Sequence, residues 1–424
     1  MAPHEEPTMD RRTLLKAGGV GLFGLGFGGC AGRSTETAQP AAATIPLAPV
    51  KASWDRVIRT TVGLRPHRPS GFVVKAAKLD DKMVVHNYGH GGAGHSIGWG
   101  TGSLAADLAD AQDARRAAVL GCGTVGLTAA RQLQRRGYDV TIYTAAVPPY
   151  TTSNMAWAAF TPTSGLIGRG GRSPAWEAQF RAAVEIAYRE LQLLAGRDEY
   201  GIAWLNSYST LESLPKERTA PPRESQTAGL LPEYMRGSRE ILGPGEHPFP
   251  TAYASRRPRL RIEPSVYLDA LMRDIRLFGA KIVLRKFDSP RDLMTLDEPL
   301  IVNCTALGSR ELFGDEELTP VKGQLTFLVP QPEVDYGFGG SIDGPNGRVR
   351  ASTNPRRDGI ALSGAGNAPG EWSLTPNEDA VRQVVQGAIS LSQAILAVPA
   401  GERMVTAAPR RPAPAVDDFF DRES

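Results

Sequence analysis

The sequence has few of the residues that cross-link a chain or carry it through a membrane. Only three cysteines occur in 424 residues, and Cys30 lies in the N-terminal leader, so no disulfide framework is expected in the mature chain. Cys122 and Cys304 stand in apolar, strand-like runs, where inert buried thiols are expected. The apolar run Ala17–Gly29 is shorter than the roughly 20 residues that span a bilayer.

The sequence also has no excess of charge of either sign. Lysine and arginine number 48 and aspartate and glutamate 45, which leaves a net charge of +3. This balance, with no long basic run, excludes a composition typical of nucleic-acid binding. The length suits two domains or one large two-layer domain of a soluble globular protein.

The N-terminus is predicted to be a targeting segment. Arg11 and Arg12 precede a mildly apolar stretch, which is typical of a twin-arginine export signal. Phe27–Cys30 resembles a lipoprotein cleavage box, although Phe27 is a poor first residue for one. A lipid anchor at Cys30 and an ordinary signal cut near Ala31 both remain open. Either predicts an exported protein of the periplasm or cell envelope.

Glycine is abundant, and it gathers around three histidines. Residues Val84–Gly100 read VVHNYGHGGAGHSIGWG, and a small-residue helix is expected over Gly98–Asp107. One interpretation is a tight packed turn. A second is a metal site of His86, His90 and His95, whose spacing matches no standard ligand pattern. A third is a cofactor cradle, in which backbone N–H groups approach an anion at a helix N-terminus.

A second glycine-rich stretch favours the cofactor cradle. An apolar strand leads into Gly121-x-Gly123-x-x-Gly126, and a helix and a second strand follow. Strand, GxGxxG, helix and strand in this order form the context of the dinucleotide fingerprint. The acidic residue that usually binds the ribose is missing, because Thr144 and Ala145 stand at the end of the second strand.

Two further patterns supply polar side chains. Arg65 lies before Pro66 in an extended segment, where its guanidinium can form a fork with a carboxylate; the plainer interpretation is a surface arginine in a turn. Thr151, Thr152 and Ser153 can donate to phosphates or a ring system, or cap a helix.

The remaining chain alternates predicted helices and strands. Helices are expected over Ala175–Leu194, Glu263–Phe278 and Pro376–Leu396, and strands over Lys281–Phe287, Leu300–Cys304 and Lys322–Val329. Irregular segments are expected as a tether over Ser34–Ser53, surface loops over Ser213–Pro250 and a disordered tail over 399–424.

Together these stretches resemble the D-amino-acid oxidase family, whose members carry a GxGxxG unit, a Thr-rich turn, a VNCTG-like strand, a GxRPxRP segment and an HNYGHGGxG…WG loop. The matching stretches are Gly121–Gly126, Thr151–Ser153, Val302–Ala306, Gly63–Pro69 and His86–Gly100. The last two are C-terminal in the family but precede the dinucleotide unit here. The resemblance therefore implies a circular permutation, which is feasible because chain termini often lie close together.

The resemblance implies an α/β fold with a Rossmann-like FAD-binding domain and a substrate domain on a mainly antiparallel sheet. It implies FAD as cofactor and no metal. Arg65 is expected to bind the substrate carboxylate, and the carbonyl of Gly92 to meet the substrate amine. The residues implied to bind FAD are Gly91, Ala93, Gly94, His95, Ser96, Ile97, Gly121, Gly123, Thr124, Val125, Gly126, Thr151, Thr152, Ser153 and Phe287, the last in the strand that meets adenine.

The sequence departs from the family's pattern at several site positions. Arg348 and Ser352 fall where the family has two active-site tyrosines. Ala158 replaces a glycine near the flavin, its neighbour Trp157 replaces a small residue, and Ala145 replaces the ribose-binding acid. Cofactor binding is therefore better supported than the identity of the substrate.

The expected domain organisation interleaves the two domains. In chain order it is a signal over 1–30, a linker over 31–55, FAD-binding segments over 56–165 and 260–317, substrate-domain segments over 166–259 and 318–398, and the tail.

The resemblance implies oxidation of a D-amino acid, or a related amine alpha to a carboxylate, by hydride transfer from Cα to FAD, with O₂ reduced to H₂O₂ and no essential side-chain base. The expected partners are the amino-acid substrate, O₂ or another acceptor, and the twin-arginine export machinery. Alternatives are a dehydrogenase that reduces a periplasmic acceptor, or an inactive exported protein that keeps FAD as a structural ligand.

Overall fold

The structure is a computed structural model, and it describes residues 44–166, 172–214, 229–235, 237–344, 347–364 and 368–397. All of these residues belong to the compact unit that spans Ala42–Ser424. The predicted export signal with Arg11, Arg12 and Cys30 lies outside the described residues, as does the predicted tail over 399–424.

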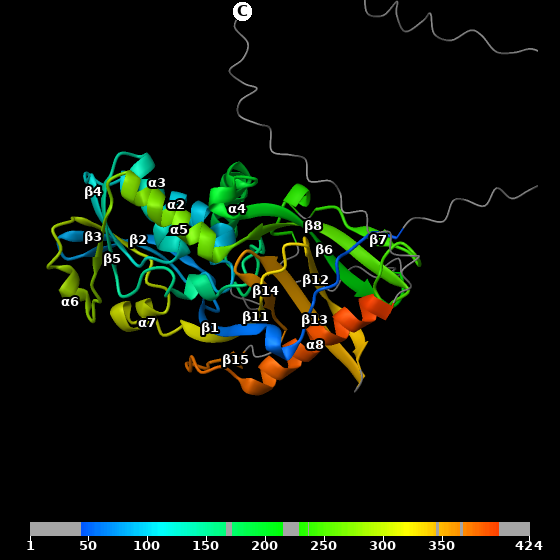
Figure 1. Ribbon diagram of the computed structural model, residues 1–424. Coiled ribbons are helices and arrows are strands. Elements are labelled where there is room, and N and C mark those ends of the chain that lie inside the picture. Colours follow the sequence, from blue (N-terminus) through cyan, green and yellow to red (C-terminus); the bar gives the residue numbers. More distant parts are fainter. Residues whose placement is uncertain are drawn as a thin grey trace, which may run out of the picture. The chain divides into compact units, whose positions relative to one another are not determined.

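A six-stranded sheet carries the GxGxxG motif (Figure 1). Its strands in spatial order are β2 (Val73–Leu79), β3 (Lys82–Tyr88), β10 (Leu300–Asn303), β4 (Arg116–Leu120), β5 (Asp139–Thr144) and β9 (Lys281–Leu284). Neighbours from β3 to β9 are parallel, and β2 is antiparallel to β3. The central strands are nearly continuous apolar runs, as expected for a parallel sheet that is buried on both faces.

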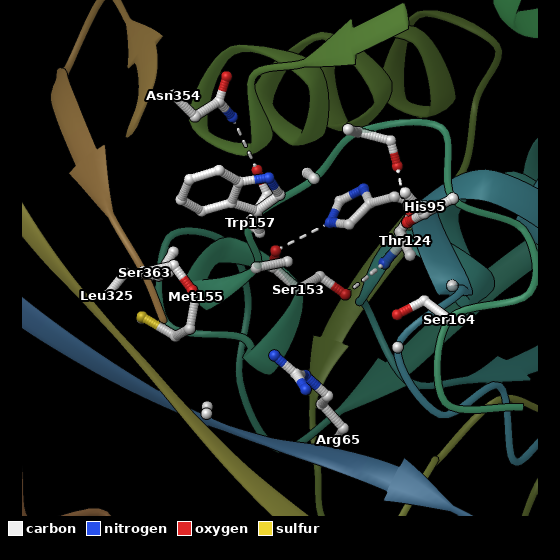
Figure 2. Close-up of a pocket in the computed structure, with 18 of the residues that line it drawn as sticks. Arg65, His95, Thr124, Ser153, Met155, Trp157, Ser164, Leu325, Asn354 and Ser363 are labelled. Atoms are coloured by element: carbon white, nitrogen blue, oxygen red, sulfur yellow. Dashed lines mark hydrogen bonds between the residues drawn. The ribbon is translucent and has the colours of Figure 1, made fainter. Parts of the chain in front are cut away.

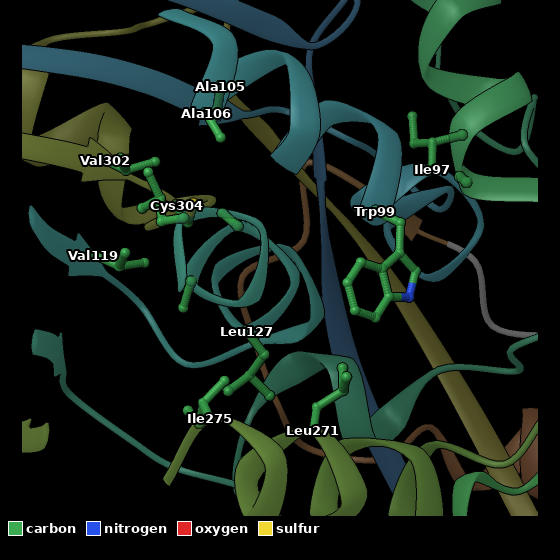
Figure 3. Packing of buried hydrophobic residues seen from close by; sticks show 14 of the residues in the cluster. Ile97, Trp99, Ala105, Ala106, Val119, Leu127, Leu271, Ile275, Val302 and Cys304 are labelled. Atoms are coloured by element: carbon green, nitrogen blue, oxygen red, sulfur yellow. The ribbon is translucent and has the colours of Figure 1, made fainter. Parts of the chain in front are cut away.

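Helices cover both faces of this sheet. One hydrophobic cluster joins the strands to α2 (Gly94–Asp110), α3 (Thr124–Arg135), α4 (Pro174–Leu194) and α5 (Pro264–Leu277). Figure 3 shows Leu127 of α3 close to Leu271 and Ile275 of α5. A smaller cluster on the alternate strand residues packs against α6 (Pro290–Leu293) and α7 (Gly308–Phe313). The layered α/β fold predicted for this region is confirmed.

The second sheet has nine strands and is mainly antiparallel. Its strands in spatial order are β1 (Val57–His67), β11 (Thr319–Leu328), β14 (Gly359–Leu362), β13 (Gly347–Arg356), β12 (Tyr336–Gly344), β6 (Ile202–Leu211), β8 (Tyr253–Ile262) and β7 (Glu240–Leu242), with β15 (Ala368–Pro369) beside β11. Helix α8 (Glu378–Ala397) packs on one face through a cluster that includes Phe338, Ile360 and Leu391. Short 3₁₀ turns are η1 (Trp54–Arg56), η2 (Thr152–Met155), η3 (Asp198–Tyr200) and η4 (Glu233–Met235).

The helix expected to begin at Gly98 begins four residues earlier, at Gly94. Glycine disfavours helix on propensity alone, but close packing requires it here. A Cβ on Gly100 would lie 1.8 Å from the carbonyl oxygen of Ala183 in α4. The loop predicted to contact the cofactor is therefore in part the first turn of a helix.

The segment predicted as a free tether is packed over its described part. Leu47 and Val50 are buried in the cluster under α8, and the Tyr336 hydroxyl donates to the Ala48 carbonyl over 2.9 Å. Ile45 also donates its backbone N–H to Glu246. The polar, proline-rich composition does not reveal these contacts because they depend on the distant strand β12.

Three other boundaries differ from the prediction. Strand β1 pairs with β11 in the antiparallel sheet, so the predicted FAD-binding segment 56–165 contributes to both sheets. Strand β9 ends at Leu284, which leaves Phe287 beyond it. The predicted surface loops over Ser213–Pro250 contain the edge strand β7. Among the helices the structure describes, none combines the length and apolarity needed to cross a bilayer.

Candidate functional site

A cavity of about 640 Å³ opens between the two sheets (Figure 2). Its walls come from β1, the N-terminal turns of α2 and α3, the segment around η2, and the face of the antiparallel sheet opposite α8. Four arginines line it, whereas no aspartate, glutamate or lysine does among the described residues. This composition suits an anionic ligand.

The N-terminus of α3 points its first amides into this cavity. Gly123, Thr124 and Val125 line the wall. Gly121 has a φ of +102°, and a Cβ on Gly126 would lie 2.0 Å from the Gly121 carbonyl oxygen. Only glycine permits this tight turn, which brings the helix N-terminus to a ligand.

The N-terminus of α2 faces the same cavity from another side. Gly94 and His95 line it, and Ala93 supplies no side-chain cap, so the first amides of the helix are available to a ligand. The N–H groups of Gly91 and Gly92 already donate to Pro66 and Ser164 carbonyls. The backbone N–H groups of this segment that remain available to a ligand are therefore those at the start of α2.

The Thr-Thr-Ser turn is held between the two helix starts. The Ser153 hydroxyl accepts the Thr124 N–H over 3.0 Å, and the Ser153 carbonyl accepts a 2.9 Å hydrogen bond from His95 Nε2 (Figure 2). Burial lowers the pKa of His95 to about 4, so the ring is neutral near pH 7 and Nδ1 is an acceptor. This Nδ1 is buried and has no partner among the described residues.

The other two histidines of the glycine-rich stretch have separate structural partners. His86 Nδ1 accepts a hydrogen bond from the Asn303 side chain, and His90 Nε2 is 2.8 Å from the Thr101 hydroxyl. Across the described residues, no group of three or more His, Cys, Asp or Glu is arranged to hold a metal ion. The geometry thus gives no support to the metal-site interpretation of His86, His90 and His95.

Arg65 projects from β1 into the cavity (Figure 2). It pairs with Val321 of β11, and a Cβ on Gly323 would lie 3.0 Å from its Nη2. Burial lowers the pKa of Arg65, and no carboxylate pairs with it among the described residues. The guanidinium is therefore a partly desolvated cation without a counter-ion, in a setting that favours an anionic ligand.

The residues predicted to bind FAD, together with Gly92, which was predicted to meet the substrate amine, divide into two groups. Those that line the cavity are Gly91, Gly92, Gly94, His95, Gly123, Thr124, Val125, Thr152 and Ser153. Those outside its lining are Ala93, Ser96, Ile97, Gly121, Gly126, Thr151 and Phe287. Ser96 in the second group supports a lining residue, because its hydroxyl accepts the Thr161 N–H over 2.8 Å. Phe287 instead packs on Tyr143 in the cluster beneath α6 and α7.

Ser352 and Arg348, the positions that stand for the family's tyrosines, are not equivalent in space. Ser352 lines the cavity, whereas Arg348 is exposed and pairs with Glu212. Arg350, between them on β13, lines the cavity instead, and so does Arg259 on β8. Sequence reasoning missed both, although the alternation of arginines in the stretch Arg257–Arg261 was a readable signal of one cationic strand face.

Two alanines in left-handed backbone conformations also line the cavity. Ala158 has a φ of +45° and Ala306 a φ of +56°, which is uncommon for residues other than glycine. The segment of Ala158 is anchored by Asn354, which donates to the Trp157 carbonyl, and by Arg356, which donates to the Ala156 carbonyl over 2.6 Å. These two anchors, which sequence reasoning also missed, stabilise the conformation that Ala158 requires.

A dinucleotide fits this set of groups. Two helix N-termini offer backbone donors to a pyrophosphate, and a Cβ on Gly123 would lie 2.9 Å from Ser153 Oγ, in the place where the ligand must pass. The unpartnered Nδ1 of His95 is an acceptor for an N–H or O–H group of the ligand. No carboxylate among the described lining residues repels phosphate.

Comparisons with known proteins agree with this geometry. The profile of a family described as FAD dependent oxidoreductase matches residues 116–421. A D-amino acid oxidase of Dugesia ryukyuensis is 26% identical over 277 residues, which cover 64% of this chain and 75% of the relative. A D-amino-acid oxidase of Rubrobacter xylanophilus is 25% identical over 70% of this chain and 83% of its own length.

A solved structure was found as well. Glycine oxidase from Geobacillus kaustophilus has a TM-score of 0.45 and 18% identity, and the match covers 66% of this chain and 80% of that one. The family profile covers well over half of the chain. The chain therefore belongs to the family of FAD-dependent oxidoreductases, it is an enzyme, and FAD is its cofactor.

Proposed function

We propose that the enzyme oxidises a D-amino acid to the imino acid, which hydrolyses to the 2-oxo acid, and that O₂ takes up the electrons to give H₂O₂. The observation that carries the proposal is Arg65, an uncompensated cation that lies in the same cavity as two helix N-termini. An amino acid brings the carboxylate that this guanidinium lacks. The names of the relatives from Dugesia ryukyuensis and Rubrobacter xylanophilus support the same substrate class.

The protein's own groups bind and orient the reactants. Bound FAD supplies the acceptor for a hydride from the substrate Cα. Arg65 holds the carboxylate in a bidentate fork, and the Gly92 carbonyl accepts from the substrate amine. The lining histidines, His90 and His95, are buried with pKa values of about 3 and 4, and no lining carboxylate is present among the described residues. Catalysis by orientation, without a side-chain base, fits this set of groups.

Anaerobic titration of the purified holoenzyme with a panel of D-amino acids tests the proposal. We expect bleaching of the flavin absorption with D-amino acids and none with amines that lack a carboxylate. Arg65→Ala should lower kcat/KM by about 10–200-fold, because a charge-assisted hydrogen bond contributes roughly 1.5–3 kcal/mol. Arg65→Lys should recover only part, since an ammonium lacks the planar fork.

Flavin content is the control: Arg65 belongs to β1 and not to either helix N-terminus, so both variants should retain FAD. Wild-type turnover in Arg65→Ala would show that the carboxylate is bound elsewhere. Peroxide release compared with dye reduction distinguishes an oxidase from a dehydrogenase with another acceptor. A flavin that no amino acid reduces would favour an inactive FAD-binding protein.

We also propose that the chain is a circular permutation of the family's order. The family profile begins at Arg116, the first residue of β4, yet β3 precedes it in the chain and pairs with β10 inside the same sheet. A chain with residues 114–424 followed by residues 44–113 should fold and bind FAD as the natural order does. If this reordered chain stays unfolded while the natural chain folds, the permutation is not supported.

We propose that the N-terminal leader directs export by the twin-arginine route. Arg11 and Arg12 before a weakly apolar stretch support it, and Cys30 is the candidate for a lipid anchor in the cell envelope. Replacing both arginines with lysine should leave the holoenzyme in the cytoplasm, as measured by cell fractionation. Unchanged export of this variant would contradict the proposal.

A further inference from the structure

The cationic side chains of the cavity outnumber the anionic groups assigned so far. Arg261 is the only one of the four lining arginines with an ion pair among the described residues, at 2.9 Å from Glu263. Arg65, Arg259 and Arg350 have no such partner. Helix N-termini, which use backbone amides, account for the cofactor's phosphates. Arg65 accounts for one substrate carboxylate, so Arg259 and Arg350 are left over.

The register of the antiparallel sheet separates these two arginines. Thr353 of β13 stands in one row with Phe338, Leu362 and Thr326. Arg350 is three residues from this row, toward the end of the sheet at which Arg65 lies on β1. Arg259 is displaced by three residues in the opposite direction. Arg350, and not Arg259, is therefore placed to act together with Arg65.

The floor between these positions consists of short side chains. Ser207, Ser209, Gly337, Gly339, Ser352 and Ser363 all line the cavity. None of them carries a charge, and Ser352 stands where the resemblance leads us to expect a tyrosine. The space over β12 and β13 therefore admits a substrate side chain, and none of these short side chains offers Arg350 a charged partner.

We propose that the substrate is an amino acid with a second anionic group, an acidic D-amino acid, whose side-chain carboxylate is bound by Arg350 while Arg65 binds the α-carboxylate. The inference rests on the proposed oxidation of D-amino acids and names the substrate class of the same site. Arg350 is a specificity-determining residue in this arrangement, because it binds the part of the substrate that does not react.

Isosteric substrate pairs give a direct test with the holoenzyme. D-glutamate is compared with D-glutamine, and D-aspartate with D-asparagine, by kcat/KM. The wild type should favour each acid over its amide by about 10-fold or more, the range expected for a charge-assisted hydrogen bond. Arg350→Gln should reduce this preference to near unity, and Arg350→Lys should retain part of the preference.

Two matched variants isolate the contact from a general effect of charge. Arg259→Gln removes a lining cation at the other end of the cavity, and Arg348→Gln removes a cation on the same strand as Arg350 that lies outside the lining. Both should keep the preference for acids. A wild type that prefers the amides, or an Arg350→Gln enzyme that keeps the preference, would overturn the proposal. Each preference is a ratio within one variant, so partial misfolding does not obscure it.

A binding measurement separates this proposal from the proposed function. Glutarate and butyrate, which carry two carboxylates and one, are titrated against the flavin absorption spectrum. Tighter binding of glutarate that disappears in Arg350→Gln supports the second anion site even if no amino acid is oxidised. Equal affinity of the wild type for the two probes overturns the second anion site, whether or not neutral D-amino acids reduce the flavin.

Discussion

The two walls of the cavity are built in different ways. The wall under the parallel sheet presents backbone amides at the starts of α2 and α3, fixed by Gly121, Gly126 and the Ser153 turn. The wall on the antiparallel sheet presents side chains, mainly arginines among serines and glycines. A site made of backbone groups needs an invariant conformation, whereas a site made of side chains can change its specificity with the fold unaltered. The cofactor wall fits the family's pattern, and the substrate wall departs from it.

Removal of the residues before Ala114, which contribute to both walls, should have the largest effect on folding and flavin binding. A chain that begins at Ala114 lacks β1, which pairs with β11, and β3, which lies inside the parallel sheet. It also lacks Arg65 and the whole of α2. We expect insoluble or unfolded protein without flavin, as judged by circular dichroism and absorption. A stable yellow fragment would mean that the two walls do not depend on this segment.

The next largest effect should fall on the cofactor wall alone. Gly123→Val places a side chain within 2.9 Å of Ser153 Oγ and in the path of the pyrophosphate. Flavin content should fall about tenfold or more, because overpacking costs about 1–3 kcal/mol and 1.4 kcal/mol is a factor of ten. The double variant with Ser153→Ala distinguishes the causes.

If the double variant regains flavin, the clash with Ser153 was responsible, and the pyrophosphate does not approach Gly123. Gly243→Val is the matched control, since Gly243 lies outside the cavity lining and its added Cβ would come no nearer than 3.4 Å to another group. Full flavin content in Gly123→Val itself would place the phosphates elsewhere.

The smallest effect should be a loss of folding stability at low pH, caused by the buried histidines of the glycine-rich stretch. Burial lowers the pKa of His86 and His95 to about 4 and that of His90 to about 3. The unfolded chain, with histidine pKa near 6.5, binds protons that the folded chain does not, so stability falls as the pH falls from about 6.5 toward 4.

Denaturant unfolding between pH 8 and 5.5 measures this effect. The free energy of unfolding should be flat from pH 8 to 7 and then decrease by up to about 1.4 kcal/mol per pH unit for each histidine. His90→Gln should reduce the slope, because it removes one of the three groups. A profile with no slope below pH 6.5 would mean that the three rings are not buried as described.

The sequence alone predicted the parts that depend on local backbone rules. The GxGxxG turn requires glycine at Gly121 for a positive φ, and the apolar strand and the amphipathic helix on either side of it follow from local periodicity. The helix α5 with Pro264 in its first turn was predicted for the same reason. The α/β fold of the whole chain was predicted through the family resemblance. Arg65 was predicted as a site residue only through its family resemblance, and its place in the cavity agrees.

Only the tertiary structure decided where separate strands place their side chains. Strand register places both Arg350 and Arg259 in the lining of one cavity. Arg348, two residues from Arg350, lies outside that lining. The early start of α2 depends on the contact of Gly100 with Ala183 in α4. The burial of Val50 depends on partners that lie far along the chain. Local sequence carries no record of these distances, because they are set by pairing between segments that are remote in the chain. The backbone cradle for the cofactor could therefore be predicted from the sequence, and the lining arginines Arg259 and Arg350 of the substrate side could not.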